Sequence, residues 1–182
     1  MSRPAIFLDR DGTLVEEVNY LHRADDTRLF PDTASALTAL KDAGYLLVVV
    51  TNQSGIGRGI YSEIDMQSVH NALQNQLNGI IDGFYHCPHL PCDGCECRKP
   101  GLKMIRDAER DLDIDVGRSW MVGDKKIDVE TGHAAGMRTA LVLTGYGKSH
   151  KGSLEGHPDV IAADLGQAAA EILRLTSAKV VV

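Results

Sequence analysis

Two carboxylates separated by one residue, Asp9 and Asp11, directly follow the apolar run Ala5–Leu8. Four apolar or small residues in succession predict a short strand that is buried on both faces. Ligands bind at the carboxyl ends of strands in an open parallel sheet, and Gly12 permits a tight turn there. Paired acids at such a place can hold a divalent cation, attack an electrophile or exchange a proton. The structural alternative is a solvated Asp-Gly turn.

Three further polar residues stand at comparable places. Thr51 and Asp124 each follow an apolar run that predicts a strand, and Lys99 stands in a loop before a predicted helix. A hydroxyl can hold a phosphoryl oxygen, an ammonium can neutralise a transferred group, and a third carboxylate completes an oxygen site for Mg²⁺. Singly, each has a structural alternative, such as Asp124 and Asp128 serving as a helix-capping pair. Together at consecutive strand ends they predict a phosphoryl-transfer site.

A second cluster is formed by the cysteines, all four of which lie between Cys87 and Cys97. Disulfides among them would close only very short loops, so they would constrain the unfolded chain little. With His89 also in this loop, the density of soft ligands indicates tetrahedral zinc in a closed, structural site. The alternative is a loop with free buried thiols.

The apolar pattern supplies the elements that position these residues. Strands are expected at 5–8, 46–50, 83–86, 119–122, 139–143 and 160–162, and helices at 33–43, 63–79, 102–112, 127–135 and 165–175. Residues 16–28, 52–59 and 145–158 are expected to be loops, and the glycines after Thr51 do not match a dinucleotide-binding fingerprint. Alternating strands and helices predict an α/β fold, a doubly wound parallel sheet, in a single domain of residues 1–182. The apolar end Ala178–Val182 has no evident partner.

Composition narrows the function. The formal net charge of −6 over 182 residues argues against a nucleic-acid partner, which normally meets a basic surface. No apolar run approaches membrane-spanning length, and the start Met1–Pro4 lacks a signal-peptide pattern. We therefore expect a cytoplasmic protein with a small-molecule substrate and no membrane partner, and we expect a monomer.

Four motifs together resemble the haloacid dehalogenase superfamily of aspartate-nucleophile phosphatases, over nearly the whole chain. They are DRDGT at Asp9–Thr13, VVVTNQSG at Val48–Gly55, CRKP at Cys97–Pro100 and VGDKKID at Val122–Asp128. More narrowly, DRDGT with TNQSGIGRG and the cysteine loop resembles the D-glycero-D-manno-heptose-1,7-bisphosphate 7-phosphatase family. The resemblance implies a Rossmann-like fold. The stretches from Thr13 to Val48 and from Thr51 to Lys99 leave no room for a large cap domain, so we expect the zinc loop to form one wall of the pocket.

The resemblance also implies roles for the catalytic residues. Asp9 attacks phosphorus and becomes an aspartyl phosphate, while Asp11 protonates the departing sugar oxygen and then takes a proton from the hydrolytic water. Thr51 and Lys99 hold the phosphoryl oxygens. The Mg²⁺ ligands are Asp9, the backbone carbonyl of Asp11, and Asp124.

The same resemblance implies the remaining ligands. The zinc ligands are Cys87, His89, Cys95 and Cys97, whereas Cys92 departs from the family pattern. The substrate-binding residues are Glu17, Val18, Asn19, Tyr20, Thr51, Asn52, Gln53, Ser54, Arg98 and Lys125. Arg98 and Lys125 add positive charge for a second phosphate, so the implied substrate is a sugar bisphosphate that loses its C7 phosphate during synthesis of a heptose precursor of lipopolysaccharide.

Three other functions stay open at this point. Histidinol-phosphate phosphatase shares the cysteine loop but carries NQDG where this chain has NQSG at Asn52–Gly55. An open site could accept a phosphorylated polynucleotide end, although the net charge disfavours it. A non-catalytic sugar-phosphate sensor would not need the proton-transfer carboxylate of Asp11.

Overall fold

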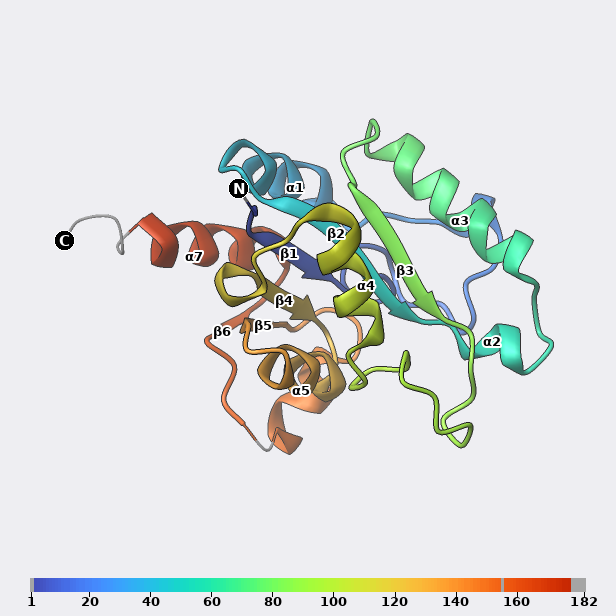
Figure 1. The fold of residues 1–182 in the computed structure, drawn as a ribbon. Coiled ribbons are helices and arrows are strands. Elements are labelled where there is room, and N and C mark those ends of the chain that lie inside the picture. Colours follow the sequence, from blue (N-terminus) through green and yellow to red (C-terminus); the bar gives the residue numbers. More distant parts are fainter. Residues whose placement is uncertain (1, 155, 178–182) are drawn as a thin grey trace.

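The computed structural model describes residues 2–154 and 156–177, and it contains a six-stranded, all-parallel sheet in the order β3-β2-β1-β4-β5-β6 (Figure 1). The strands are β1 (Ala5–Leu8), β2 (Leu46–Asn52), β3 (Gly83–Cys87), β4 (Trp120–Gly123), β5 (Arg138–Val142) and β6 (Val160–Ala162). This architecture confirms the doubly wound parallel sheet expected from the alternating pattern.

Helices cover both faces of the sheet (Figure 1). They are α1 (Thr33–Asp42), α2 (Ser54–Gly57), α3 (Glu63–Gln76), α4 (Lys103–Leu112), α5 (Lys126–Ala134), α6 (Gly147–His150) and α7 (Leu165–Ser177), with 3₁₀ turns η1 (Ala24–Asp26), η2 (Val116–Arg118) and η3 (Lys151–Ser153). Ile6 and Leu8 pack in the core under α1, α3 and α7, whereas Ala5 and Phe7 pack in the core under α4. Side chains alternate along a strand, so β1 supplies both cores and is apolar throughout.

Most elements begin and end within two residues of the predicted positions, and the clearest departures concern β2, α3 and the expected loops. Strand β2 continues to Asn52 because that residue still pairs with β3, opposite Cys87. Helix α3 begins at the expected Ser62 cap but ends at Gln76, since Asn78 and Gly79 have φ of 52° and 75° and cannot continue a right-handed helix. All three of the expected loops contain short helical turns, namely η1 within 16–28, α2 within 52–59 and α6 with η3 within 145–158.

The order of the strands decides where the site forms. The chain winds outward from β1 to β2 and β3, and α4 then carries it back across the sheet to β4 on the other side of β1. Strand β1 therefore lies at the topological switch point, where the carboxyl ends of neighbouring strands open a crevice. Among the described residues, no helix is long and apolar enough to cross a membrane. The apolar end at 178–182 lies outside the described residues.

Candidate active site

A cleft of about 220 Å³ opens at the carboxyl ends of β1, β2 and β4. The residues that line it are Asp9, Asp11, Glu17, Asn19, Tyr20, Leu21, Thr51, Asn52, Gln53, Ser54, Tyr61, Lys99, Lys125, Ile127 and Tyr146. The predicted catalytic residues Asp9, Asp11, Thr51 and Lys99 are all among them. Strand order has therefore gathered side chains that are far apart in the sequence.

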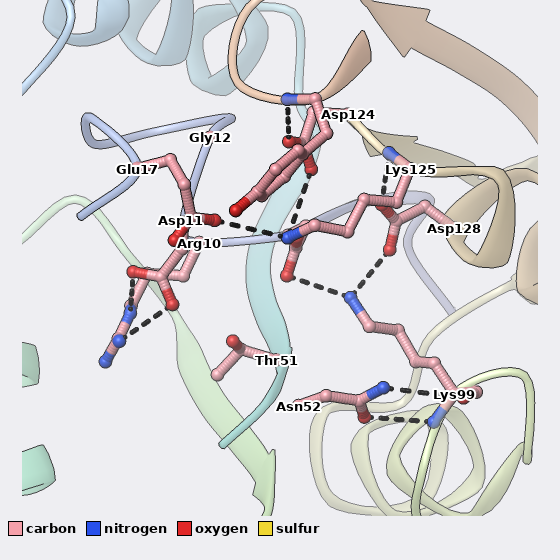
Figure 2. Close-up of polar contacts among 12 residues, drawn as sticks. Arg10, Asp11, Gly12, Glu17, Thr51, Asn52, Lys99, Asp124, Lys125 and Asp128 are labelled. Carbon is pink, nitrogen blue, oxygen red and sulfur yellow. Dashed lines mark hydrogen bonds and ion pairs between the residues drawn. The ribbon is translucent and has the colours of Figure 1, made fainter. Parts of the chain in front are cut away.

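Asp9 lies at the floor of this cleft beside the buried ammonium of Lys99. Lys99 Nζ donates to Asp9 Oδ1 at 2.9 Å and to Asp128 Oδ1 at 2.7 Å (Figure 2). It also donates to the Val50 carbonyl at 2.9 Å. Burial alone raises the pKa of Asp9, but the charges of Lys99 and Lys125 outweigh it and hold that pKa below its ordinary value. The carboxylate is thus kept in the ionised form that a nucleophile requires.

The loop that carries Lys99 is tied to the end of β2. The Lys99 backbone N–H donates to Asn52 Oδ1 at 3.0 Å, and Asn52 Nδ2 donates to the Lys99 carbonyl at 3.4 Å (Figure 2). The side-chain amide of Asn52 is therefore engaged in positioning this loop, although the residue still lines the cleft.

Asp124 supplies a buried carboxylate at the end of β4. Its Oδ2 accepts from the Tyr146 backbone N–H at 2.7 Å, whereas its buried Oδ1 has no hydrogen-bond partner among the described residues. Burial, followed by the negative charge of Asp9, raises the pKa of Asp124 to about 7. Single carboxylate oxygens of Asp9, Asp124 and Asp128 lie within 4.8 Å of one another. An unbonded buried oxygen in such a cluster fits a hard divalent cation such as Mg²⁺.

The sequence did not identify Asp128 as a site residue, because a helix-capping role explains an aspartate at this position equally well. Its Oδ2 accepts from the Lys125 backbone N–H at 3.0 Å, as a cap does, while its Oδ1 binds Lys99. Both oxygens are therefore engaged, and Asp9 with Asp124 is the better-suited pair for the metal. The available signal was its place in the VGDKKID motif, in the first turn of the helix that follows Asp124.

The turn after β1 requires glycine at position 12. Gly12 has φ of 87°, and a Cβ there would collide with the Asp124 carboxylate. Thr144 Oγ1 donates to the Gly12 carbonyl at 2.6 Å and holds the turn in place. The main chain beside Asp11 is thereby brought against Asp124, as metal binding by the Asp11 carbonyl would require. That ligand stays a prediction.

Lys125 is the cation shared by the acids of the cleft. Its Nζ lies 3.3 Å from Glu17 Oε2, 3.7 Å from Asp124 Oδ1 and 3.9 Å from Asp9 Oδ2, and 5.0 Å from the centre of the Tyr146 ring (Figure 2). Burial lowers the pKa of Lys125, but these carboxylates outweigh it and raise that pKa. Lys125 is therefore charged and faces the cleft.

The structure places two predicted substrate residues outside the cleft lining. Val18 is 39% exposed and lines a neighbouring depression instead. Arg98 donates through Nη1 to the His89 carbonyl at 3.3 Å, within the cysteine loop, and none of residues 87–97 is among those that line the cleft, so the expected wall is not seen. The other eight predicted substrate residues do line the cleft, and so do Tyr61 and Tyr146, which no sequence motif indicated, and Ile127, which lies within the VGDKKID motif but was assigned no role. The substrate contacts themselves stay predictions.

The cysteine loop brings four soft ligands together. The sulfurs of Cys87, Cys95 and Cys97 and Nδ1 of His89 all lie within 4.8 Å of one another. Representative separations are 2.9 Å between the sulfurs of Cys87 and Cys97 and 3.1 Å from His89 Nδ1 to Cys97 Sγ. Cys92 is exposed and its sulfur donates to Asp93 Oδ1 at 3.8 Å instead. Three sulfurs and one imidazole converging in this way fit structural zinc.

Comparisons with known proteins agree with this geometry. A family model described as HAD-hydrolase-like matches residues 96–168. The chain is 44% identical to the D-glycero-beta-D-manno-heptose-1,7-bisphosphate 7-phosphatase of Haemophilus ducreyi over 157 residues, which cover 80% of this chain and 86% of that protein. It is 40% identical to the D-glycero-D-manno-heptose-1,7-bisphosphate 7-phosphatase of Thermosynechococcus vestitus over 185 residues, covering 92% and 94% of the two chains.

A solved structure extends the likeness to three dimensions. The D,D-heptose 1,7-bisphosphate phosphatase of B. bronchiseptica, complexed with magnesium and phosphate, matches with a TM-score of 0.87 and 30% sequence identity. The match covers 94% of this chain and 99% of that one.

Proposed function

Because this chain belongs to the D-glycero-D-manno-heptose-1,7-bisphosphate 7-phosphatase family of the haloacid dehalogenase-like hydrolases, we propose that it removes the C7 phosphate of that heptose bisphosphate. The observation that carries the proposal is the position of Asp9 at the switch point of the sheet. There an ionised carboxylate faces a cleft that is also lined by Asp11, Thr51 and Lys99. The product, a heptose 1-phosphate, suits the synthesis of a cell-surface sugar precursor.

In the first chemical step, a carboxylate oxygen of Asp9 forms a bond to phosphorus as the bond from phosphorus to the C7 oxygen breaks. Asp11 gives a proton to that departing oxygen, so the sugar leaves as an alcohol. In the second step, water attacks phosphorus, the bond from phosphorus to the Asp9 oxygen breaks, and Asp11 takes a proton from the water. Inorganic phosphate is released, and the Asp9 carboxylate and the protonated Asp11 are restored. Thr51 and Lys99 hold the phosphoryl oxygens throughout.

Mg²⁺ would be held by the carboxylates of Asp9 and Asp124 and by the Asp11 carbonyl. When bound, it supplies positive charge that offsets the charge of the transferring phosphoryl group. Zinc would be held by Cys87, His89, Cys95 and Cys97, where it would fix the shape of the loop that precedes Lys99.

The C1 phosphate is retained in this proposal and is bound by Arg98. The bond from Arg98 to His89 uses only one of the five N–H donors of its guanidinium, so a fork remains for an anion. Loss of a charged hydrogen bond costs about 1.5–3 kcal/mol, so we expect Arg98→Ala to lower kcat/KM for the bisphosphate about 10-fold or more. A monophosphate should be little affected. Arg118→Ala is the matched control, because Arg118 is exposed and pairs with Asp115 on η2.

The assignment is tested by phosphate release from a panel of esters. The panel holds both anomers of the heptose bisphosphate, histidinol phosphate, fructose bisphosphate and a 3′-phosphorylated oligonucleotide. We expect one anomer of the heptose bisphosphate to have the highest kcat/KM and to release one phosphate per molecule. Preference for histidinol phosphate would replace the proposal with that activity, and absence of release from every ester would indicate a binding protein.

A further inference from the structure

A chain of hydrogen bonds connects Tyr61 to two polar residues of the cleft. The Tyr61 hydroxyl donates to Gln53 Oε1 at 2.5 Å, and Gln53 Nε2 donates to Asp11 Oδ2 at 2.9 Å and to Thr51 Oγ1 at 2.8 Å. Gln53 is 3% exposed, so water does not compete for its amide. With the amide reversed, its oxygen would face the Asp11 carboxylate. Tyr61 therefore reinforces the one orientation in which Gln53 donates to both residues.

This orientation decides what Thr51 can do. The Thr51 hydroxyl has one hydrogen, and its oxygen already accepts from Gln53. Its own O–H is therefore left to donate to another acceptor, and Thr51 lines the cleft. A phosphoryl oxygen is the acceptor that the proposed reaction brings there.

Asp11 is held from both sides. Arg10 is fully buried, and it donates from Nε to Asp11 Oδ1 at 3.0 Å and from Nη2 to Oδ2 at 2.8 Å (Figure 2). Oδ2 thus accepts two hydrogen bonds, from Arg10 and Gln53, while Oδ1 accepts one. The remaining lone pair on Oδ1 identifies it as the atom that can carry a proton to or from the cleft.

Local packing also fixes the Tyr61 ring. A Cβ at position 55 would collide with that ring, so Gly55 in α2 is what allows the close approach. The His22 ring also stacks on the Tyr61 ring, with centroids 5.6 Å apart and planes 6° from parallel. Burial raises the pKa of Tyr61 to about 12, so its hydroxyl keeps the proton that it donates.

We propose that Tyr61 is a positioning residue, which orients Gln53 so that the Gln53 amide aligns the proton-transfer carboxylate of Asp11. The proposal rests on the proposed function in one respect, namely that Asp11 protonates the leaving oxygen during phosphoryl transfer to Asp9. It does not depend on which sugar phosphate is the substrate.

The test compares Tyr61→Phe with the wild type on two kinds of phosphate ester. An alkyl phosphate needs a proton on its leaving oxygen, whereas p-nitrophenyl phosphate releases a stable anion without one. We expect kcat/KM for the alkyl ester to fall about 10-fold, part of the roughly 10²–10⁴-fold that proton transfer contributes, and that for the aryl ester to fall less than about 3-fold. The control is Tyr45→Phe, since the buried Tyr45 shares one hydrogen bond with Thr176 Oγ1 of α7, next to the amino end of β2, and should change neither value.

A double variant separates action through Gln53 from direct contact with substrate. Gln53→Met should reproduce the selective loss on the alkyl ester, and adding Tyr61→Phe to it should cause no further loss. An equal loss on both esters, or a full additional loss in the Gln53→Met background, would overturn the proposal. If Tyr61→Phe fails to fold, Gln53→Met alone must still show the leaving-group dependence or the proposal fails. The alkyl ester used in this test is whichever ester of the panel the wild-type enzyme hydrolyses best. If that ester is not the heptose bisphosphate, the proposed function is wrong but this test still applies.

Discussion

Replacement of Lys99 by methionine should destabilise the protein strongly. Lys99 is 2% exposed, and its ammonium lies 2.9 Å from Asp9 Oδ1 and 2.7 Å from Asp128 Oδ1, both on side chains that are 6% exposed or less. Removing one partner of a buried ion pair leaves uncompensated charge and typically costs about 3–5 kcal/mol. In Lys99→Met two carboxylates lose their common cation, and the Val50 carbonyl loses a donor.

The expected loss is large relative to the whole stability, which for a folded protein is about 5–15 kcal/mol. Urea unfolding in Mg²⁺-free buffer measures it. With a slope of about 2 kcal/mol per molar urea, a loss of about 4 kcal/mol moves the midpoint down by about 2 M. The matched control is Lys103→Met, whose exposed pair with Asp107 on α4 contributes about 0.2–0.5 kcal/mol.

A second substitution tests whether charge is the cause. Asp128→Asn keeps an oxygen to accept from the Lys125 backbone N–H but removes one of the two negative charges. The double variant Lys99→Met with Asp128→Asn should therefore recover part of the stability that Lys99→Met loses. A loss below about 1 kcal/mol for Lys99→Met, or no recovery in the double variant, would refute the reasoning.

Three other outcomes are expected. Asp9→Asn should abolish phosphate release while calorimetry still detects substrate binding, because the amide keeps the shape and loses the nucleophile; a near-normal rate would instead indicate attack by water. Metal analysis should find one zinc per chain in Cys92→Ser and none in Cys95→Ser, whereas zinc-free Cys92→Ser would place Cys92 in the ligand shell. Burial lowers the pKa of His70 from 6.5 to about 3 in the folded protein. Between these two pH values the unfolded chain binds a proton that the folded chain does not, so the protein loses stability as the pH falls below 6.5. Urea unfolding at pH 7.5 and 5 should show that the wild type loses up to about 1.4 kcal/mol of unfolding free energy per pH unit, and that His70→Leu does not. If His70→Leu loses stability with pH as steeply as the wild type, His70 is not the cause.

The sequence by itself determined the elements and the chemistry of the strand ends. Buried strands of a parallel sheet are continuous apolar runs, so the pattern located β1 with Asp9 after it and indicated Thr51 at the carboxyl end of β2. The acids and the lysine were recognisable by residue type, and the cysteine loop by its local density, because neither needs knowledge of the sheet order. Gly12 was predicted as a turn, although only the fold shows that a side chain there would strike Asp124.

The tertiary structure alone decided which side chains meet and in which direction they point. The place of β1 between β2 and β4 brings Asp9 beside Asp124, and no local pattern encodes that order. Tyr61 and Arg10 act on Asp11 through hydrogen bonds whose geometry depends on packing across the whole cleft. Arg98 and Lys99 are neighbours in the sequence, yet Arg98 donates to the His89 carbonyl in the cysteine loop whereas Lys99 is buried against Asp9. Adjacent residues on an irregular loop take their directions from distant partners, and those partners are fixed only when the sheet has assembled.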